Sequence, residues 1–566
     1  MGTHQEIFRG PGTLNLMTSN SRVVEVDEKT GKILSRTNSA ASLETFEPEH
    51  TLQRGLKSRQ VQLIAIAGAI GTGLFLGSGS TLAQTGPASL VLSYIVLGSV
   101  VYFVMHCVAE MIIYRPLPGK GVVDIVGTYL SPSISFAIGW NYWYAFSILI
   151  AAEVTAAGAV FQYWVDVNVA APISVLLVIV IAMNAVSVRV FGEAEFWFGL
   201  IKLIALMGLI ILAIVLFFGG GPKQHGVVGF RYWKKNAFKA YLVKDNLDLG
   251  RFLGFWTAIV KSGFSYIFGP EMIATCLGET ENPRKNGIKA SKRFIWRLLF
   301  FYVLGSLGIS VIVSSSDKKL FGSASDAKGS PWVIGIQNAG IPVLNHIINA
   351  VILTSACSAA NSFLYTATRM LFSMAERGNA PKIFARVNRW GIPYYSLAAS
   401  SALGFLAYLN CSSSASNVFS WLSNLTTTSG FISWIAICFA FIRFRKACKV
   451  HDCSDRVPYK TYLGPFGAYY VIVFMTLLTL TNGYPSFVHG FSGADFVAAY
   501  VTLPIVFGLY VVHRAYDYFK NHNKHWLNPI EDIDMFSGLD LIEAEERNFV
   551  EPVPKNALQK FWYWVA

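Results

Sequence analysis

The feature that most constrains this chain is a series of apolar blocks, each about as long as a helix that crosses a lipid bilayer. Of its 566 residues, 53% are hydrophobic and only 14% are charged. In soluble proteins about 25% of residues are charged. The chain is therefore predicted to be an all-α polytopic membrane protein.

Twelve helices are predicted to cross the membrane, which places both termini on one side. The loops after even-numbered spans carry more lysine and arginine than those after odd-numbered spans, so the positive-inside rule puts the termini in the cytosol. The long basic loop 219–252 is predicted to lie outside and fits this rule least. The predicted spans are 61–84, 88–113, 133–164, 172–188, 195–218, 253–277, 296–315, 342–374, 393–411, 416–442, 465–488 and 494–516.

The net charge of +13 is spread over short loops between spans, which favours a role in membrane topology over binding of nucleic acid. The seven cysteines show no metal-site spacing, and the chain has no HExxH, CxxC or phosphate-loop motif. We predict no nucleic acid partner, no metal and no organic cofactor. A membrane enzyme is the weakest alternative, so the chain is not predicted to be an enzyme.

Three glycines interrupt the first predicted span, at Gly68, Gly71 and Gly73. Each costs a helix about 1 kcal/mol relative to alanine, and a break inside a bilayer is tolerated only where protein or a wet cavity surrounds it. The second half of a broken helix begins with free N–H groups that attract anions. The hypothesis is that a substrate carboxylate binds at Ile70–Gly73. The alternative is close packing of small residues against a neighbouring helix.

A second break is predicted five spans later, beside Gly269 and Pro270. Proline lacks an N–H and clashes with the carbonyl four residues back, which belongs to Tyr266. Matched breaks in spans 1 and 6 imply two five-span repeats, and an odd number of spans inverts the second repeat. The alternative is an ordinary proline kink. The predicted domains are a tail at 1–58, repeats at 59–218 and 253–442, two extra helices at 465–516 and a tail at 517–566.

Ionisable side chains inside the predicted spans are functional candidates, because each costs at least about 2.5 kcal/mol to insert at mid-bilayer. Glu153 and Lys261 are predicted to face a central cavity, where a structural ion pair is the alternative role. Lys202 can stand where related folds hold a cation and suits proton coupling, unless it reaches to the membrane interface. Glu271 follows the second break and is a further proton-coupling candidate.

Several segments resemble the fungal amino acid permeases of the amino acid–polyamine–organocation superfamily. They are Gly71–Phe75, Gly192–Phe198, Phe230–Trp233, Gly269–Glu271, Glu279–Lys285 and Ser429–Trp434. Within that family the chain is most similar to the proline permease group, through segments such as Ala151–Ala157, Ile334–Gly340 and Ala498–Pro504.

The resemblance implies a LeuT-like 5+5 inverted repeat plus two helices, proton symport of an amino acid, and a plasma-membrane location. It implies that Ile70, Gly71, Thr72 and Gly73 bind the substrate carboxylate, that Glu153, Lys261, Phe264 and Phe268 line the substrate route, and that Thr427 contributes to specificity. The sequence itself adds four candidate substrate contacts at the second break and in the eighth span: Ser265, Gly269, Glu271 and Cys357. Proline or another neutral amino acid is the expected substrate. Protons are the expected coupling ion, with Lys202, Glu153 and Glu271 as candidate carriers.

One departure from the proline group is Cys357, where a tryptophan is expected. Losing an indole would open the pocket, so broader neutral substrates become plausible. A second reading is an amino acid sensor that signals through its long tails. Those tails, with lysines such as Lys29 and Lys32, are also candidate sites for ubiquitin ligases and trafficking factors.

Overall fold

The chain divides into two units in the computed structural model, Met1–Gln53 and Arg54–Ala566. In the first unit the structure describes four strands. In the second it describes residues 71–548 and residue 556, apart from 117–120, 166, 187, 223–225, 268, 272–273, 275–276, 278–282, 323–329, 389–390 and 489.

The first unit contains a four-stranded antiparallel sheet in the order β1-β2-β3-β4. In the register between the two central strands, Leu14 lies opposite Val26. The expectation of an all-α chain is wrong for this segment. Three valines in Val23–Asp27 favour extended backbone over helix. The all-α prediction was made from the apolar blocks of the rest of the chain and did not take this local preference into account. The strands are β1 (Gln5–Gly10), β2 (Thr13–Met17), β3 (Val23–Asp27) and β4 (Ile33–Thr37).

In the second unit, seven helices of the described residues are long and apolar enough to cross a membrane, and a bent pair would make an eighth. The two helices of the pair meet at 44°. The seven are α3 (Pro87–Tyr114), α5 (Pro132–Phe161), α7 (Val188–Phe217), α11 (Pro283–Ile312), α14 (Leu344–Glu376), α16 (Ala415–Val450) and α17 (Pro465–Thr481) with η6 (Tyr484–Phe487); the pair is α18 (Gly493–Tyr500) and α19 (Thr502–Asn521).

The other four predicted spans correspond to shorter or interrupted elements, so the count of twelve stays a prediction. They are a π-helical turn η1 (Gly73–Gly77) with α2 (Ser78–Thr85), α6 (Ala170–Asn184), α9 (Leu247–Tyr266), and α15 (Tyr394–Gly404) with the 3-10 segment η4 (Phe405–Cys411). The connecting elements are α4 (Val122–Tyr129), α8 (Arg231–Asn236), α12 (Lys318–Gly322), α13 (Pro331–Ala339), η3 (Lys382–Ala385), η5 (Ser454–Arg456) and α20 (Leu539–Asn548).

Helix α7 has the inverse of a soluble helix's polarity. Its apolar side chains Trp197, Ile201 and Ile204 are exposed, whereas Glu195 and Lys202 are buried. An apolar exterior around charged groups is the arrangement that a lipid solvent favours, because lipid solvates hydrocarbon and not charge. The arrangement therefore supports the prediction that this helix lies in a membrane.

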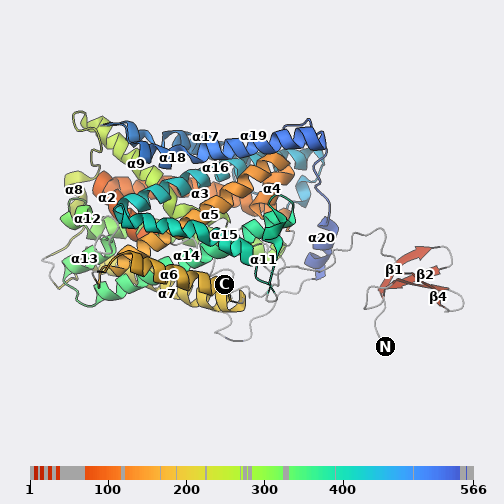
Figure 1. Cartoon of the computed structure of the whole chain (residues 1–566), viewed down its shortest axis with the longest axis horizontal. Helices are drawn as coiled ribbons and strands as arrows, with labels where there is room; N and C mark the ends of the chain where they lie inside the picture. Colours follow the sequence, from red (N-terminus) through yellow and green to blue (C-terminus); the bar gives the residue numbers. More distant parts are fainter. Residues whose placement is uncertain are drawn as a thin grey trace. The chain divides into compact units, whose positions relative to one another are not determined.

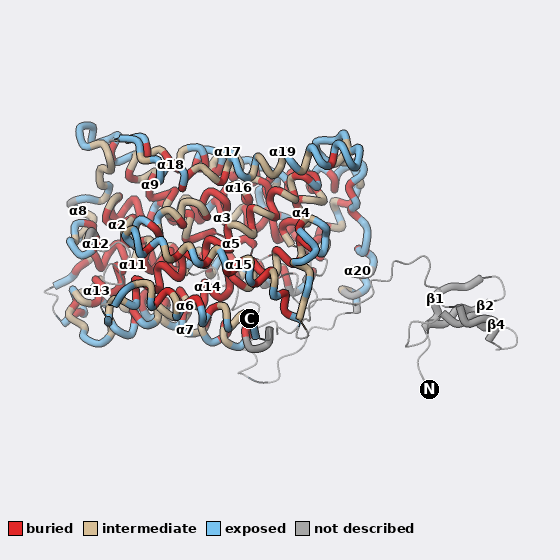
Figure 2. The backbone as a smooth tube through the Cα atoms, viewed as in Figure 1, coloured by how far each residue is buried: buried red, intermediate tan, exposed pale blue. Residues whose placement is uncertain are grey.

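The helices expected to be equivalent in the two repeats pack against each other. Helix α3 packs against α11, α5 packs against α14, and η1 packs against α9. Figure 1 shows most of these helices in the middle of the second unit. The buried residues concentrate in these central helices, and exposed residues in the outer ones (Figure 2). These pairings agree with the predicted inverted repeat, and the repeat itself stays a prediction.

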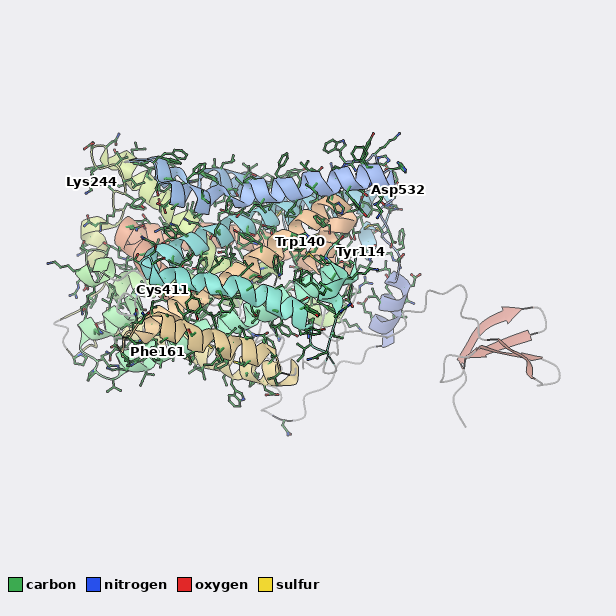
Figure 3. All side chains as sticks on the ribbon, in the orientation of Figure 1. Tyr114, Trp140, Phe161, Lys244, Cys411 and Asp532 are labelled. Carbon is green, nitrogen blue, oxygen red and sulfur yellow. The ribbon has the colours of Figure 1, made fainter. Side chains whose placement is uncertain are left out.

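The segments predicted to lie on opposite sides of the membrane lie at opposite ends of the second unit. Tyr114 and Asp532 lie towards one end, and Phe161, Lys244 and Cys411 towards the other (Figure 3). This agrees with the predicted alternation of loops.

The long loop 219–252 has a structural use for part of its positive charge. The main-chain groups of Ala237 and Lys239 form hydrogen bonds with the turn between α2 and α3. In that turn Gly86 has a φ of 89°, and a side chain there would clash with the main chain of the loop. The Lys239 Nζ donates to the carbonyl of Ala83 at 2.7 Å, near the C-terminus of α2. A cation is favourable at that end of a helix dipole, which gives this loop a reason for a lysine other than membrane topology.

Candidate functional site

The predicted break in the sixth span is confirmed at the expected residue. Helix α9 ends at Tyr266, and Ile267 leaves helical geometry with φ −56° and ψ 137°. Helical backbone resumes at Gly269, one residue before Pro270. Phe268, a predicted substrate contact, lies outside the described residues.

The first span is also irregular where its glycines lie. Gly71 is not helical, helical backbone begins at Thr72, and Gly73–Gly77 forms a π-helical turn before α2. Ile70 and the residues before it lie outside the described residues, so the structure shows a helix that begins at Thr72, and the break in the first span stays a prediction. The main-chain amide of Thr72 stands at that start.

Glu153 of α5 binds this helix start with one carboxylate oxygen. The amide of Thr72 donates to Glu153 Oε1 at 3.3 Å and its hydroxyl donates to the same oxygen at 3.1 Å. A side chain on Gly71 would clash, because its Cβ would lie 2.7 Å from that oxygen. Gly71 therefore permits the close approach of the carboxylate to the main chain.

The second oxygen of Glu153 is buried and has no hydrogen-bond partner among the described residues. The residue as a whole is 2% exposed. A buried carboxylate oxygen without a donor costs free energy, so it marks a place where a proton, a water or a ligand group can bind.

Lys202 supplies the nearby positive charge, and it interacts electrostatically with the carboxylates of Glu195 and Glu153. It is 1% exposed. The alternative that it reaches to the membrane interface is therefore wrong: α7 turns this side chain towards the protein interior.

Glu195 was not among the residues predicted for the site. It is fully buried, and it accepts hydrogen bonds from Ser358 Oγ at 2.8 Å and Asn361 Nδ2 at 2.6 Å, both on α14. A signal was present in the sequence, because Glu195 and Lys202 are seven residues apart and so share one face of a helix. The polar residues of the eighth span thus bridge to α7.

Lys261 has a different partner from the one suggested by the sequence. Its Nζ donates to Gln84 Oε1 of α2 at 2.7 Å, whereas Glu153 bonds Thr72. The suggested ion pair between Glu153 and Lys261 is therefore corrected. The two helices that carry these residues place their charges beside different segments of the first span.

Ser265, in the last turn of α9, contacts the first span directly. A Cβ on Gly73 would lie 2.6 Å from Ser265 Oγ and 3.2 Å from Phe264 Cδ1. The Phe264 ring lies edge-on to Phe419 of α16, with 5.3 Å between centroids. This part of the first span has the close packing that was the alternative reading of its glycines.

Thr427 of α16 is buried beside the same turn of α9. A Cβ on Gly263 would lie 3.0 Å from Thr427 Cγ2. Gly263 directly precedes Phe264 and Ser265 in the sequence. The structure therefore places Thr427 beside the turn of α9 that carries these two predicted site residues.

Two predicted residues after the second break have packing and hydrogen-bonding contacts. Glu271 accepts a hydrogen bond from the Tyr142 hydroxyl of α5 at 2.7 Å. A Cβ on Gly269 would lie 3.0 Å from Met105 Cε and 3.3 Å from Leu298 Cδ2, between α3 and α11. These contacts fix the resumed helix against three neighbours.

Cys357 lies on α14 next to Ser358 and is partly exposed. The neighbouring Ser358 hydroxyl donates to Glu195. The residue that replaces the expected tryptophan therefore belongs to the surroundings of the buried charges.

Charged and polar groups from several segments thus converge beside the helix start at Thr72. The groups that the structure brings together are Gly71, Thr72, Glu153, Glu195, Lys202, Cys357, Ser358 and Asn361. Among the described residues, no group of His, Cys, Asp or Glu is placed to hold a metal ion. Glu153, Glu195 and Lys202 are all ionisable, so this buried group can gain or lose a proton.

The model of a known protein family, described as amino acid permease, matches residues 60–528. The chain belongs to the amino acid permease family. The permease is 48% identical to a proline-specific permease of Emericella nidulans, over 93% of this chain and 95% of the relative. It is 50% identical to a probable proline-specific permease of Schizosaccharomyces pombe, over 88% and 90%.

A lysine-specific permease of Saccharomyces cerevisiae is less similar, at 36% identity over 92% of this chain and 84% of the relative. The resemblance to the proline permease group that the sequence motifs indicated is therefore confirmed. As a member of this family, the chain is a membrane-spanning permease for amino acids.

Proposed function

We propose that this permease imports proline or a related neutral amino acid across the plasma membrane by proton symport. The observation that carries the proposal is the contact between Thr72 and Glu153. The turn that is proposed to bind a substrate carboxylate already binds a carboxylate of the chain itself. Its stereochemistry therefore suits this functional group, and the similarity to proline-specific permeases supports the choice of substrate.

The two charged groups of a zwitterion are complementary to the main-chain partial charges at the two proposed breaks. The amides at Thr72 and Gly73 begin a helix and carry partial positive charge, whereas the carbonyls at the end of α9 carry partial negative charge. The substrate carboxylate is proposed to bind the first set and its amino or imino group the second. Phe264 and Thr427 adjoin the same turn and would contact the side chain.

Proton coupling is proposed to use the buried charges behind the first break. Glu153 has an oxygen without a partner among the described residues, and Lys202 interacts with both Glu153 and Glu195. Gain or loss of one proton changes the charge of this group while it is shielded from water. Such a change can bias the contacts between α5, α7 and the first span. Glu271 is a second candidate carrier because it is buried beside the other break.

The proposed topology has twelve spans in a LeuT-like inverted repeat plus two helices, with both termini in the cytosol. The pairing of α3 with α11 and of α5 with α14 supports it. Cys357 stands where the proline group is expected to have a tryptophan, so a range of neutral substrates wider than proline is proposed. Ubiquitin ligases and trafficking factors are proposed to act on the tails.

The test is uptake of labelled proline in cells that lack their own amino acid permeases, with every common amino acid as competitor. Concentrative uptake that strengthens with an inward proton gradient is expected, with small neutral amino acids as the best competitors. A rate of uptake that does not depend on the proton gradient would contradict symport. Signalling in response to proline without any flux would instead favour the sensor.

A further inference from the structure

Three buried tyrosines surround the end of α9 at the second break. Tyr94 of α3, Tyr266 of α9 and Tyr302 of α11 are each at most 1% exposed. Their ring centroids are 5.8 Å apart for Tyr94 and Tyr266, 5.9 Å for Tyr94 and Tyr302, and 4.6 Å for Tyr266 and Tyr302. We call this group the tyrosine cluster.

Two hydroxyls of the cluster bind one residue of the last turn of α9. The Tyr302 hydroxyl donates to the main-chain carbonyl of Ser265 at 2.5 Å. The Tyr94 hydroxyl and the Ser265 hydroxyl are 2.8 Å apart and share a hydrogen bond. The third hydroxyl, of Tyr266, donates to the carbonyl of Tyr94 at 3.0 Å, which joins the cluster internally.

The carbonyl of Ser265 needs such a donor because the helix ends one residue later. In a continuous helix it would accept from the amide of residue 269, but Ile267 leaves helical geometry. Inside a bilayer no water replaces a lost helical donor, and a buried unpaired carbonyl is costly. The rigid ring of Tyr302 brings a hydroxyl to that position and so stabilises the break.

Ser265 also contacts the first span, on its other side. A Cβ on Gly73 would lie 2.6 Å from its Oγ and 2.9 Å from its Cα. Any shift of Ser265 is therefore transmitted to the turn that holds Thr72. The tyrosine cluster thus fixes the position of both breaks relative to each other.

We propose that Tyr302, assisted by Tyr94, is a positioning residue that holds the broken end of α9 against the first span and so sets substrate affinity. This rests on the proposed function, since the two breaks must be the substrate site. Neither tyrosine touches the substrate in this scheme. Removal of the Tyr302 hydroxyl lets the last turn of α9 relax and moves both sets of main-chain dipoles.

The test compares Tyr302→Phe with Tyr114→Phe in the full-length permease. Tyr114 is a matched control, because its buried hydroxyl also donates to a main-chain carbonyl, that of Met535, at 3.1 Å. We expect Tyr302→Phe to raise the KM for proline about five- to tenfold, the factor that one lost hydrogen bond represents. The maximal rate per transporter at the surface should stay within about twofold.

The control should lose a comparable amount of thermal stability without a change in KM. Tyr94→Phe should raise KM in the same direction by a smaller factor, because it leaves the Ser265 carbonyl bonded. If Tyr302→Phe fails to reach the surface, proline-induced stabilisation is measured on the solubilised protein. If the variant is stabilised at the same proline concentrations as the wild type, the proposal is overturned.

An unchanged KM in Tyr302→Phe, or an equal rise in the control, would also overturn it. Those outcomes leave the proposed function intact, because the wild type still transports proline. Absence of proline uptake by the wild type would instead refute the proposed function itself.

Discussion

Thr72 and Glu153, which are 81 positions apart in the chain, are joined by two hydrogen bonds to a single carboxylate oxygen. One donor is a main-chain amide at the start of a helix, and the other is the hydroxyl of the same residue. Together they bind a carboxylate by the partial charge of the helix start as well as by hydrogen bonds. This contact links α5 to the first span at the residue where its helix begins.

Replacement of Glu153 by glutamine should abolish most transport without loss of the fold. The amide oxygen of the substituted side chain can still accept from Thr72, but that side chain can neither carry charge nor take up a proton. We expect surface-normalised proline uptake to fall about 10- to 100-fold, the factor that one charged hydrogen bond represents. Uptake that stays at the wild-type level under an imposed proton gradient would contradict this role.

Gly73→Ala should destabilise the permease, because the added Cβ would lie 2.6 Å from Ser265 Oγ and 2.9 Å from its main-chain Cα. Overpacking of this kind costs about 1–3 kcal/mol. Gly77→Ala, in the same helical turn, is the control, since nothing lies within 4 Å of its added Cβ. The thermal unfolding temperature of the solubilised protein should fall only for Gly73→Ala. An equal fall in both variants would show that packing against α9 is not the cause.

Lys202→Met should leave the carboxylates of Glu195 and Glu153 without their common cation. This loss should lower thermal stability, because the charge of the two buried carboxylates is then less compensated. Adding Glu195→Gln should restore part of the lost thermal stability, since the amide can keep its bonds to α14. Lys244→Met, at an exposed loop position, should leave stability unchanged. A double variant that is less stable than the single one would contradict this electrostatic coupling.

Helix α20 should detach from the rest of the permease in acid. Arg456 binds both oxygens of Glu543, at 3.1 and 3.0 Å, and Arg284 binds the first oxygen at 3.3 Å. The guanidinium of Arg456 holds the pKa of the Glu543 carboxyl below its ordinary value, and Arg284 adds to this. The stabilisation is therefore complete above that ordinary value, about 4.3, and is lost as the pH falls through the lower folded-state pKa.

Limited proteolysis of the full chain measures this detachment. Cleavage within Leu539–Asn548 should be slow at neutral pH and rise in acid. Glu543→Gln should be cleaved rapidly at neutral pH already, because it lacks the charge that Arg456 and Arg284 bind. Equal protection of the variant and the wild type would show that these ion pairs do not hold the helix.

Features that depend on neighbouring residues alone could be predicted from the sequence. The end of α9 at Tyr266 follows from the covalent structure of Pro270, which excludes helical hydrogen bonding four residues back. The positions of the long helices follow from the apolar blocks, because a bilayer admits few other structures. The sheet formed by strands β1–β4 was not predicted, because the pattern of apolar blocks carries no information about the polar segment that precedes them.

By itself, the sequence determined that this is a membrane permease and that its sixth span breaks beside a proline. Only the tertiary structure decided that Glu153 binds Thr72, that Lys202 and Glu195 are both buried, and that Lys261 binds Gln84. The physical reason is that helices such as α5 and α7 are apolar on nearly every face, so hydropathy does not specify how each is rotated. Rotation and register are set by packing between helices, and they decide which buried charges meet.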